Sequence, residues 1–177
     1  TAYRRQRQMC IRDRKQDEMI VLAVNKPRGI VCTEERRERD SIVRFLNYPV
    51  RVTYIGRLDK DSHGLLLMTN NGDIINKMMR AANKHEKEYK VTVDKEITED
   101  FLKKMASGVP ILDTVTRPCT VKKIGKYTFS IILTQGLNRQ IRRMCEALGY
   151  EVKDLLRVRV MNITLDGLKD GQYRNCL

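Results

Sequence analysis

The sequence predicts an α+β domain built on a mixed sheet. Two unbroken apolar runs, over residues 19–24 and 65–68, are typical of buried strands. Alternating apolar residues predict half-buried strands over 86–94 and 127–134. Single helices separate the strands without a regular strand-helix alternation, which favours an α+β fold over a doubly wound one.

Helices and further strands complete this outline. The spacing of apolar residues and the flanking cap residues predict four helices, over 41–47, 73–81, 98–106 and 138–148. The expected caps are Asp40 or Ser41, Thr98 and Asn138, and Gly108 and Gly149 end the last two helices. Two more strands are predicted, one over 117–124 and one through Val158 and Val160.

Length and charge indicate one basic domain. The 177 residues suffice for a single core over 19–177, preceded by a basic tail over 1–18. The net charge is +13, and residues 1–15 carry +5 of it, which leaves +8 on the rest. A domain of this charge attracts a polyanion such as nucleic acid. The alternative is a surface charged only for solubility.

Several classes of protein fit the sequence poorly. It contains no apolar run of the roughly 20 residues that a membrane helix needs, and its first residues do not resemble a signal peptide. The cysteines are odd in number and scattered, and only two histidines occur, so neither a disulfide framework nor a zinc site is expected. We expect free thiols, no bound metal and a cytoplasmic protein.

One loop combines the features of a reactive site. GRLDKDSHGLLLMTN, residues 56–70, places a polar, charged loop directly before an apolar strand. A carboxylate in such a loop is held by a rigid strand and stays open to a cleft. Asp59 is the main candidate and Asp61 its rival. The alternative is an ordinary charged turn.

This loop resembles the catalytic loop of RNA pseudouridine synthases, in the branch that acts on ribosomal RNA and includes the small-subunit enzyme A and the large-subunit enzymes B, E and F. Four further segments resemble that family's motifs in order: NKPRG at 25–29, EKEYKVTV at 86–93, QGLNRQIRRMC at 135–145 and LLRVRVMNITLDGLKDGQYR at 155–174. The resemblance covers about residues 19–174. GVPILDTVT at 108–116 is most similar to the F subfamily, whose substrate is 23S ribosomal RNA.

The resemblance implies a fold, a reaction and three catalytic residues. The sheet should be mostly antiparallel, flanked by helices around a central active-site cleft. The cofactor-free reaction detaches a uracil from its ribose, turns it and rejoins it through carbon. Asp59 would attack the sugar or take a proton from it, and both routes stay open. Arg142 would pair with Asp59 and keep it ionised. Tyr89 would stack on the extruded base and help move a proton.

The resemblance also implies an RNA-binding set around these residues. Its members would meet phosphates or pack against the extruded nucleotide. The set consists of Lys26, Arg57, Lys60, Asn138, Arg139, Gln140, Arg143 and Leu155. Arg139 and Arg143 are one helical turn apart and should share a face. The alternative for each arginine, Arg142 included, is that it is only a solvated surface charge. The alternative for Tyr89 and Leu155 is that they are ordinary core side chains.

The expected partner is RNA, either ribosomal RNA or transfer RNA, bound by a monomer away from membranes. Relatives usually carry a small S4 RNA-binding module before the catalytic domain, and only about 18 residues precede the first strand here. The chain is therefore expected to be either a fragment or a form that binds RNA with its core alone. Two rivals remain open, namely a non-catalytic RNA-binding module on this fold and a synthase for transfer RNA or small-subunit RNA.

Overall fold

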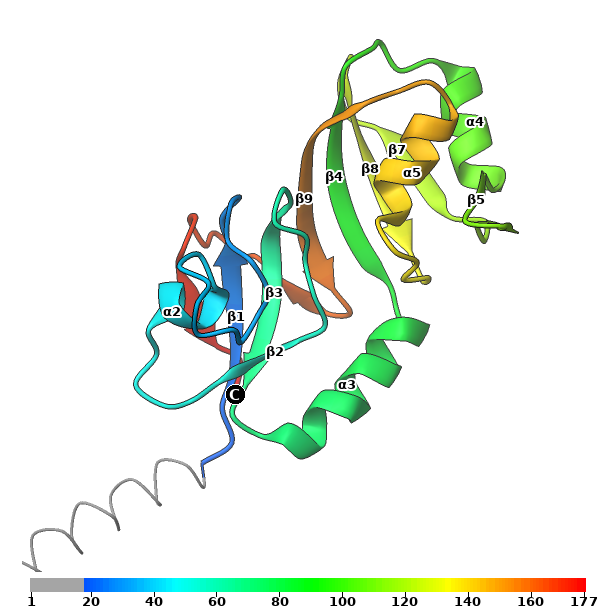
Figure 1. Cartoon of the computed structure of the whole chain (residues 1–177). Helices are drawn as coiled ribbons and strands as arrows, with labels where there is room; N and C mark the ends of the chain where they lie inside the picture. Colours follow the sequence, from blue (N-terminus) through cyan, green and yellow to red (C-terminus); the bar gives the residue numbers. More distant parts are fainter. Residues whose placement is uncertain (1–17) are drawn as a thin grey trace, which may run out of the picture.

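The computed structural model describes residues 18–177, with the exception of the side chains at positions 82 and 83. The predicted α+β class is confirmed, because a mixed and mostly antiparallel sheet runs through the molecule with helices packed on it (Figure 1). The tail predicted over 1–18 lies outside the described residues apart from Glu18.

The main sheet has the order β11-β1-β3-β9-β4-β8-β7, with β2 paired to β3 and β10 paired to β9. Its strands are β1 (Val21–Lys26), β2 (Thr53–Ile55), β3 (His63–Thr69), β4 (Lys87–Val93), β7 (Thr120–Lys123), β8 (Thr128–Leu133), β9 (Val152–Val160), β10 (Ile163–Thr164) and β11 (Tyr173–Asn175). The helices are α2 (Ile42–Leu46), α3 (Gly72–Lys84), α4 (Glu99–Ser107) and α5 (Gln140–Ala147). A separate hairpin is formed by β5 (Pro110–Ile111) and β6 (Thr114–Val115).

The apolar runs form strands β1 and β3, which are packed on both faces. Leu22 and Leu66 point into one core, together with Ile42 of α2. Ala23 and Leu65, their neighbours along the two strands, point into a second core, against which α3 packs. Because both faces are covered, neither strand needs a polar side, which explains the lack of alternation.

The other half of the sheet has a core of its own. On β8, Phe129, Ile131 and Leu133 are buried and the residues between them are only partly so, as the alternation predicted. This buried face packs against α4 and α5 through side chains such as Phe101 and Met144. The molecule therefore consists of two lobes, each with its own apolar interior.

A short parallel pairing joins the two lobes. The start of β3 runs beside β9, where Gly64 is opposite Arg157, and β9 lies between the lobes in Figure 1. Gly64 has φ of +113°, and a Cβ built on it would be 2.3 Å from the carbonyl oxygen of Arg157. Only glycine permits both this backbone conformation and this close approach.

Most of the predicted helix ends are confirmed. Ser41 and Thr98 accept hydrogen bonds from the backbone N–H groups of Arg44 and Phe101, as N-cap residues do. Gly108 ends α4 as expected. The remaining strands, β2, β5, β6, β10 and β11, have only two or three residues each and were not predicted, because such short segments show no periodicity.

The last helix starts later than predicted. We expected it to begin at Asn138, yet α5 begins at Gln140. Arg139 has φ of +47°, so the chain turns out of helical geometry at this residue. The Asn138 side chain therefore caps nothing and instead accepts a hydrogen bond of 2.9 Å from Arg143.

Replacing Gly64 with alanine should destabilise the protein by at least about 2 kcal/mol, because the new Cβ meets backbone atoms of β9 and the φ angle is unfavourable for an L residue. Urea unfolding measures the change. Gly72→Ala at the start of α3 is the matched control, because nothing lies within 4 Å of its Cβ position. Equal unfolding midpoints for the two variants would show that the seam between β3 and β9 tolerates a side chain.

Candidate active site

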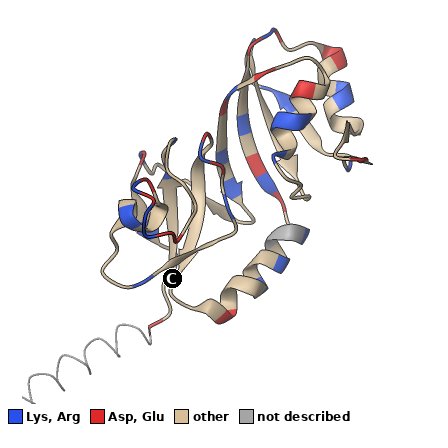
Figure 2. Ribbon diagram, viewed as in Figure 1, with Lys and Arg blue, Asp and Glu red and all other residues tan. Residues whose placement is uncertain are grey.

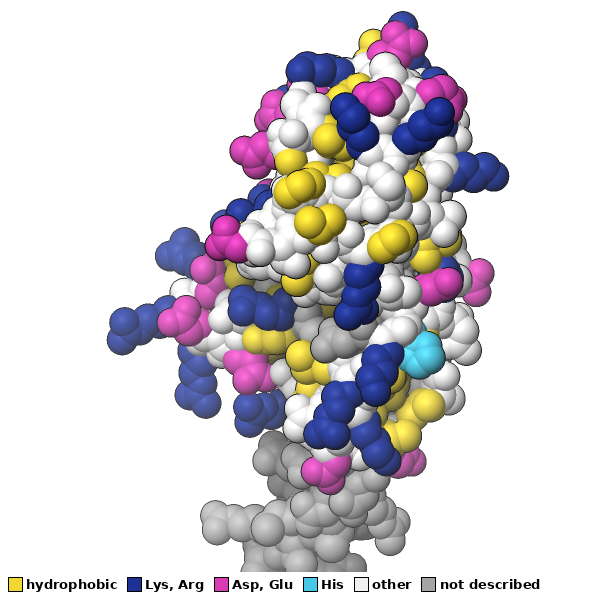
Figure 3. All heavy atoms as spheres, turned by 90° about the vertical axis from the view of Figure 1, so that its right-hand side faces the viewer, with side chains coloured by type: hydrophobic (Ala, Val, Ile, Leu, Met, Phe, Trp, Pro, Cys, Tyr) yellow, Lys and Arg dark blue, Asp and Glu magenta, His cyan; other side chains and the backbone are white. Residues whose placement is uncertain are grey.

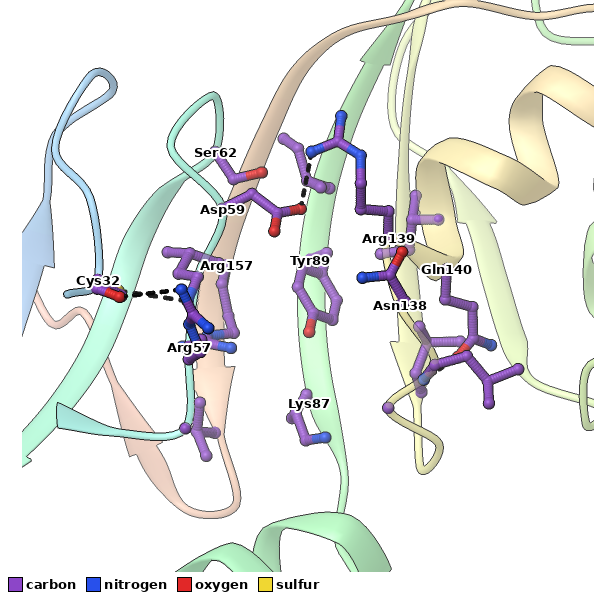
Figure 4. A pocket seen from close by; sticks show the side chains of 18 of the residues that line it. Cys32, Arg57, Asp59, Ser62, Lys87, Tyr89, Asn138, Arg139, Gln140 and Arg157 are labelled. Carbon is purple, nitrogen blue, oxygen red and sulfur yellow. Dashed lines mark hydrogen bonds and ion pairs between the residues drawn. The ribbon is translucent and has the colours of Figure 1, made fainter. Parts of the chain in front are cut away.

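A pocket of about 540 Å³ lies between the two lobes, a size that suits a small ligand or a single nucleoside. Residues 55–60 and 62 form one wall and residues 135–141 form another. Side chains of β4, β8 and β9 form the floor, and Met78 and Met79 of α3 close one side. Figure 4 shows Asp59 and Tyr89 within this pocket, on the loop before β3 and on β4 respectively.

The structure brings most of the predicted residues together. Those that line the pocket are Arg57, Asp59, Lys60, Tyr89, Asn138, Arg139, Gln140 and Leu155. Lys26, Arg142 and Arg143 do not line it. Arg142 instead lines a neighbouring hollow, which shares Lys60 and Arg139 with the pocket.

Backbone contacts fix the loop that carries Asp59. The Ser62 N–H donates to the Asp59 carbonyl oxygen at 3.0 Å, which closes a tight turn. The Gly29 N–H donates to the Lys60 carbonyl oxygen at 2.8 Å, and the Arg57 guanidinium donates to the Cys32 carbonyl oxygen at 3.1 Å (Figure 4). The NKPRG segment is thus a support for this loop.

Arg139 links the two carboxylates of the loop. Its Nη1 lies 3.2 Å from Asp59 Oδ2. It also binds both oxygens of Asp61, at 3.2 and 3.0 Å. The hydrogen bonds from Arg139 hold the pKa of Asp61 below its usual value, and Asp61 in turn raises the pKa of Arg139. The same guanidinium therefore contacts both Asp59 and Asp61.

In this structure the ion pair of Arg142 is with Asp61 and not with Asp59, the expected partner. Arg142 donates to the Asp61 carbonyl oxygen at 3.1 Å and to Ser62 Oγ at 3.0 Å. Its ion pair, at 3.6 Å, is with the Asp61 carboxylate. Arg139 takes the place beside Asp59 because it precedes the helix in a left-handed conformation. Burial lowers the pKa of Arg142, so it acts here as an internal support of the loop.

Two other residues of the expected RNA-binding set have protein partners in this structure. Lys26 is fully buried, and its Nζ donates to the carbonyl oxygens of Pro27 and Ile30 at 2.9 and 2.7 Å. Burial lowers the pKa of Lys26 to about 8. The Arg143 guanidinium binds Asn138, whereas the partners of Arg139 are the carboxylates of Asp59 and Asp61. Lys26 therefore holds a turn, and Arg143 holds the end of a loop.

Two cations of the pocket were missed by sequence reasoning. Lys87 and Arg157 are both buried and both line the pocket beside Tyr89 (Figure 4). Lys87 is two residues before Tyr89 on β4, so the strand period could have identified it. Arg157 is opposite Tyr89 on β9, a pairing that no local pattern predicts. Figure 2 shows basic residues on both of these central strands.

Other features of the described part bear on cofactors and membranes. Cys32, Cys119, Cys145 and Cys176 are free thiols, as expected for the described cysteines. Within residues 18–177 no group of three or more His, Cys, Asp or Glu side chains could hold a metal ion. No helix in the same range is long and apolar enough to cross a membrane.

The comparisons with known proteins agree with this geometry. The family described as RNA pseudouridylate synthase matches residues 20–147. The chain belongs to the RNA pseudouridine synthase family. It is 58% identical over 165 residues to the dual-specificity RNA pseudouridine synthase RluF of Escherichia coli (strain K12), an alignment that covers 93% of this chain and 57% of that protein.

More distant members of the family extend the picture. The ribosomal large subunit pseudouridine synthase B of Bacillus subtilis (strain 168) is 35% identical over 90% of this chain and 69% of its own length. A solved structure titled as a pseudouridylate synthase superposes with a TM-score of 0.82 at 28% identity, covering 90% of this chain and 71% of that one. These matches confirm the resemblance to this family and its fold. The chain spans about 57% of the length of RluF.

Replacing Arg139 with methionine should raise the pKa of Asp61 toward its ordinary value, because the hydrogen bonds from Arg139 are the main cause of its depression. A depressed carboxylate pKa stabilises the fold above the usual carboxyl pKa and loses that effect as the pH falls through the depressed value. NMR titration of the Asp61 side chain measures the shift. Arg143→Met is the control, since Arg143 binds Asn138 instead. An unmoved pKa in Arg139→Met would show that the pairing does not persist in solution.

Proposed function

We propose that this chain isomerises uridine to pseudouridine in RNA, with Asp59 as the catalytic carboxylate and without a cofactor. One observation carries the proposal. A half-exposed carboxylate, a neighbouring guanidinium and the ring of Tyr89 meet in one pocket between two rigid lobes. Membership of the RNA pseudouridine synthase family supports the same reaction. The catalytic unit would be residues 19–177.

The roles of the three groups follow from their chemistry. The Asp59 carboxylate either attacks C1′ of the ribose or removes the proton of C2′, and in both routes the bond from C1′ to N1 breaks. Arg139 places a cation beside the Asp59 carboxylate in the free protein. Tyr89 offers a flat surface for the extruded base and a hydroxyl for moving the C5 proton. Arg142 contributes by fixing the turn at Asp61 and Ser62.

Cations around the pocket would hold the RNA backbone. Lys60 lines the mouth, and Lys77, Arg80 and Lys84 are exposed on α3, beside the methionines that close one side of the pocket. In Figure 3, Lys and Arg side chains gather on the lower part of the face that is turned to the viewer, where α3 lies. Phosphate contacts of this kind position RNA without reading its sequence.

The proposed substrate is 23S ribosomal RNA, bound by a monomer in the cytoplasm. The resemblance of residues 108–116 to the F subfamily and the high identity to RluF support this choice. Because that relative is described as dual-specificity, we include transfer RNA as a second substrate. Mapping pseudouridine in ribosomal and transfer RNA from cells with and without the gene tests both substrates.

Asp59→Asn should abolish isomerisation, because an amide can neither attack C1′ nor accept a proton, while RNA binding stays within a few-fold. Tritium release from 5-tritiated uridine RNA measures turnover, and filter binding measures affinity.

Asp61→Asn is the matched control, since Asp61 shares the same arginine. Asp61→Asn should slow the reaction without abolishing it, because the ion pair that positions Arg139 is lost. Turnover by Asp59→Asn near the parent rate, or complete loss in Asp61→Asn alone, would move the catalytic role from Asp59 to Asp61.

Chelation should leave the rate unchanged, because the proposed reaction uses only side chains of the chain itself. The test is tritium release before and after dialysis against EDTA, with the RNA folded beforehand and its structure checked by native gel. Loss of activity that a divalent ion restores, with the RNA fold unaffected, would contradict the cofactor-free mechanism.

A further inference from the structure

Two buried cations on the pocket floor lack an anionic partner. Lys87 and Arg157 are only 8% and 7% exposed. Arg157 Nε donates to the Leu65 carbonyl oxygen at 2.7 Å, which leaves the rest of its guanidinium available. Across residues 18–177 neither side chain forms an ion pair, and no hydrogen bond involves Lys87 Nζ.

Such an arrangement opposes folding. Burial lowers the pKa of Lys87, and the nearby charge of Arg157 lowers it further. Two like charges that are close together and partly desolvated destabilise the folded state unless an anion joins them. A methionine or leucine at position 87 would avoid the cost of a buried charge. The presence of these cations therefore indicates a ligand.

The position of Tyr89 defines what that ligand touches. Lys87 and Tyr89 are on the same face of β4, and Arg157 is opposite Tyr89 on β9. In Figure 4 Asp59 lies beside one end of the Tyr89 ring, and the Tyr89 hydroxyl points toward the end where Lys87 lies. A flat group stacked on this ring would therefore have Asp59 at one end and Lys87 at the other.

The base of the target nucleotide fits this space better than a phosphate does. Under the proposed function C1′ of the ribose is at Asp59. The phosphates are attached to that same ribose, so they remain at the mouth of the pocket with it, where Lys60 and Arg139 lie. The base extends away from C1′ toward the floor, and the carbonyl oxygens of uracil are hydrogen-bond acceptors.

We propose that Lys87 and Arg157 bind the carbonyl edge of the extruded uracil and stabilise the negative charge that it acquires on detachment. This inference rests on the proposed function. When the bond from C1′ to N1 breaks, its electron pair leaves with the uracil and spreads onto the O2 and O4 oxygens. C1′ meanwhile gains a bond to the Asp59 carboxylate, or C2′ gives its proton to Asp59 and a C1′–C2′ double bond forms. Fixed cations aimed at developing charge lower the barrier most in a site that excludes water.

The same pair would select uracil over cytosine. Cytosine has an amino group in place of O4, and that group donates hydrogen bonds as an ammonium and a guanidinium do. The cation that faces this amino group would have no acceptor there, and an unsatisfied donor in a buried site costs free energy. Lys87 and Arg157 are therefore specificity-determining as well as catalytic residues in this proposal.

The test uses Lys87→Met, which keeps the length of the side chain and removes its charge. Lys87→Arg is the conservative variant. Lys90→Met is the matched control, because Lys90 is on the same strand, exposed on the opposite face. Single-turnover rates of cleavage of the C1′–N1 bond, read from the loss of the target nucleoside in digested RNA, are measured on a substrate RNA and on the same RNA with 5-fluorouridine at the target. Binding of each variant is measured at several salt concentrations, and thermal melts check folding.

We expect Lys87→Met to react ten- to a hundredfold more slowly, with affinity for RNA within threefold of the parent. Lys87→Arg should recover part of the rate, and Lys90→Met should match the parent. Fluorine withdraws electrons and stabilises the leaving anion, so the defect of Lys87→Met should shrink at least threefold on the 5-fluorouridine RNA.

Three results would overturn this inference while leaving the proposed function intact. The first is an unchanged rate for a folded Lys87→Met. The second is a defect of equal size on both RNAs. The third is weaker binding with a salt slope reduced by about one, the signature of a lost phosphate contact. An inactive parent protein would instead remove the proposed function, and this inference with it.

Discussion

The parallel pairing of β3 with β9 is the constraint on which the rest of the molecule depends. Each lobe has its own core, and this short seam sets how the two face each other. The loop of Asp59 ends where β3 begins, and Tyr89 on β4 is opposite Arg157 on β9. The placement of the carboxylate beside the ring is therefore decided at Gly64, where only a missing Cβ lets the two backbones approach.

Features that depend on neighbours along the chain could be predicted from the sequence. Apolar runs and alternation identified the long strands, and the hydroxyls of Ser41 and Thr98 identified two helix starts, because these signals are local. The seam could not be predicted, since Gly64 and Arg157 are far apart in sequence. The start of α5 was misjudged because Asn138 is a good cap residue by type, and nothing local indicates that Arg139 turns out of the helix.

The sequence motifs identified many of the residues that form the site, but they did not identify which of those residues contact each other. Asp59 and Tyr89 share the pocket as the resemblance implied. The arginine beside Asp59 in this structure is Arg139 and not the expected Arg142, because sequence order cannot tell which of two arginines in one motif reaches across a cleft. Lys26 shows the same limit, since a lysine in a polar turn is usually exposed, yet here backbone carbonyl oxygens surround it.

The charge surplus of this chain contains two kinds of cation with different physical roles. Exposed cations such as Lys60 and Lys77 act through a screened field, so their attraction for a phosphate backbone weakens with salt. Lys87 and Arg157 are largely buried and line the pocket, so their attraction acts at short range on whatever enters it. Net charge alone indicates a polyanion partner. The two buried cations indicate the pocket in which one nucleotide of that polyanion would be bound and modified.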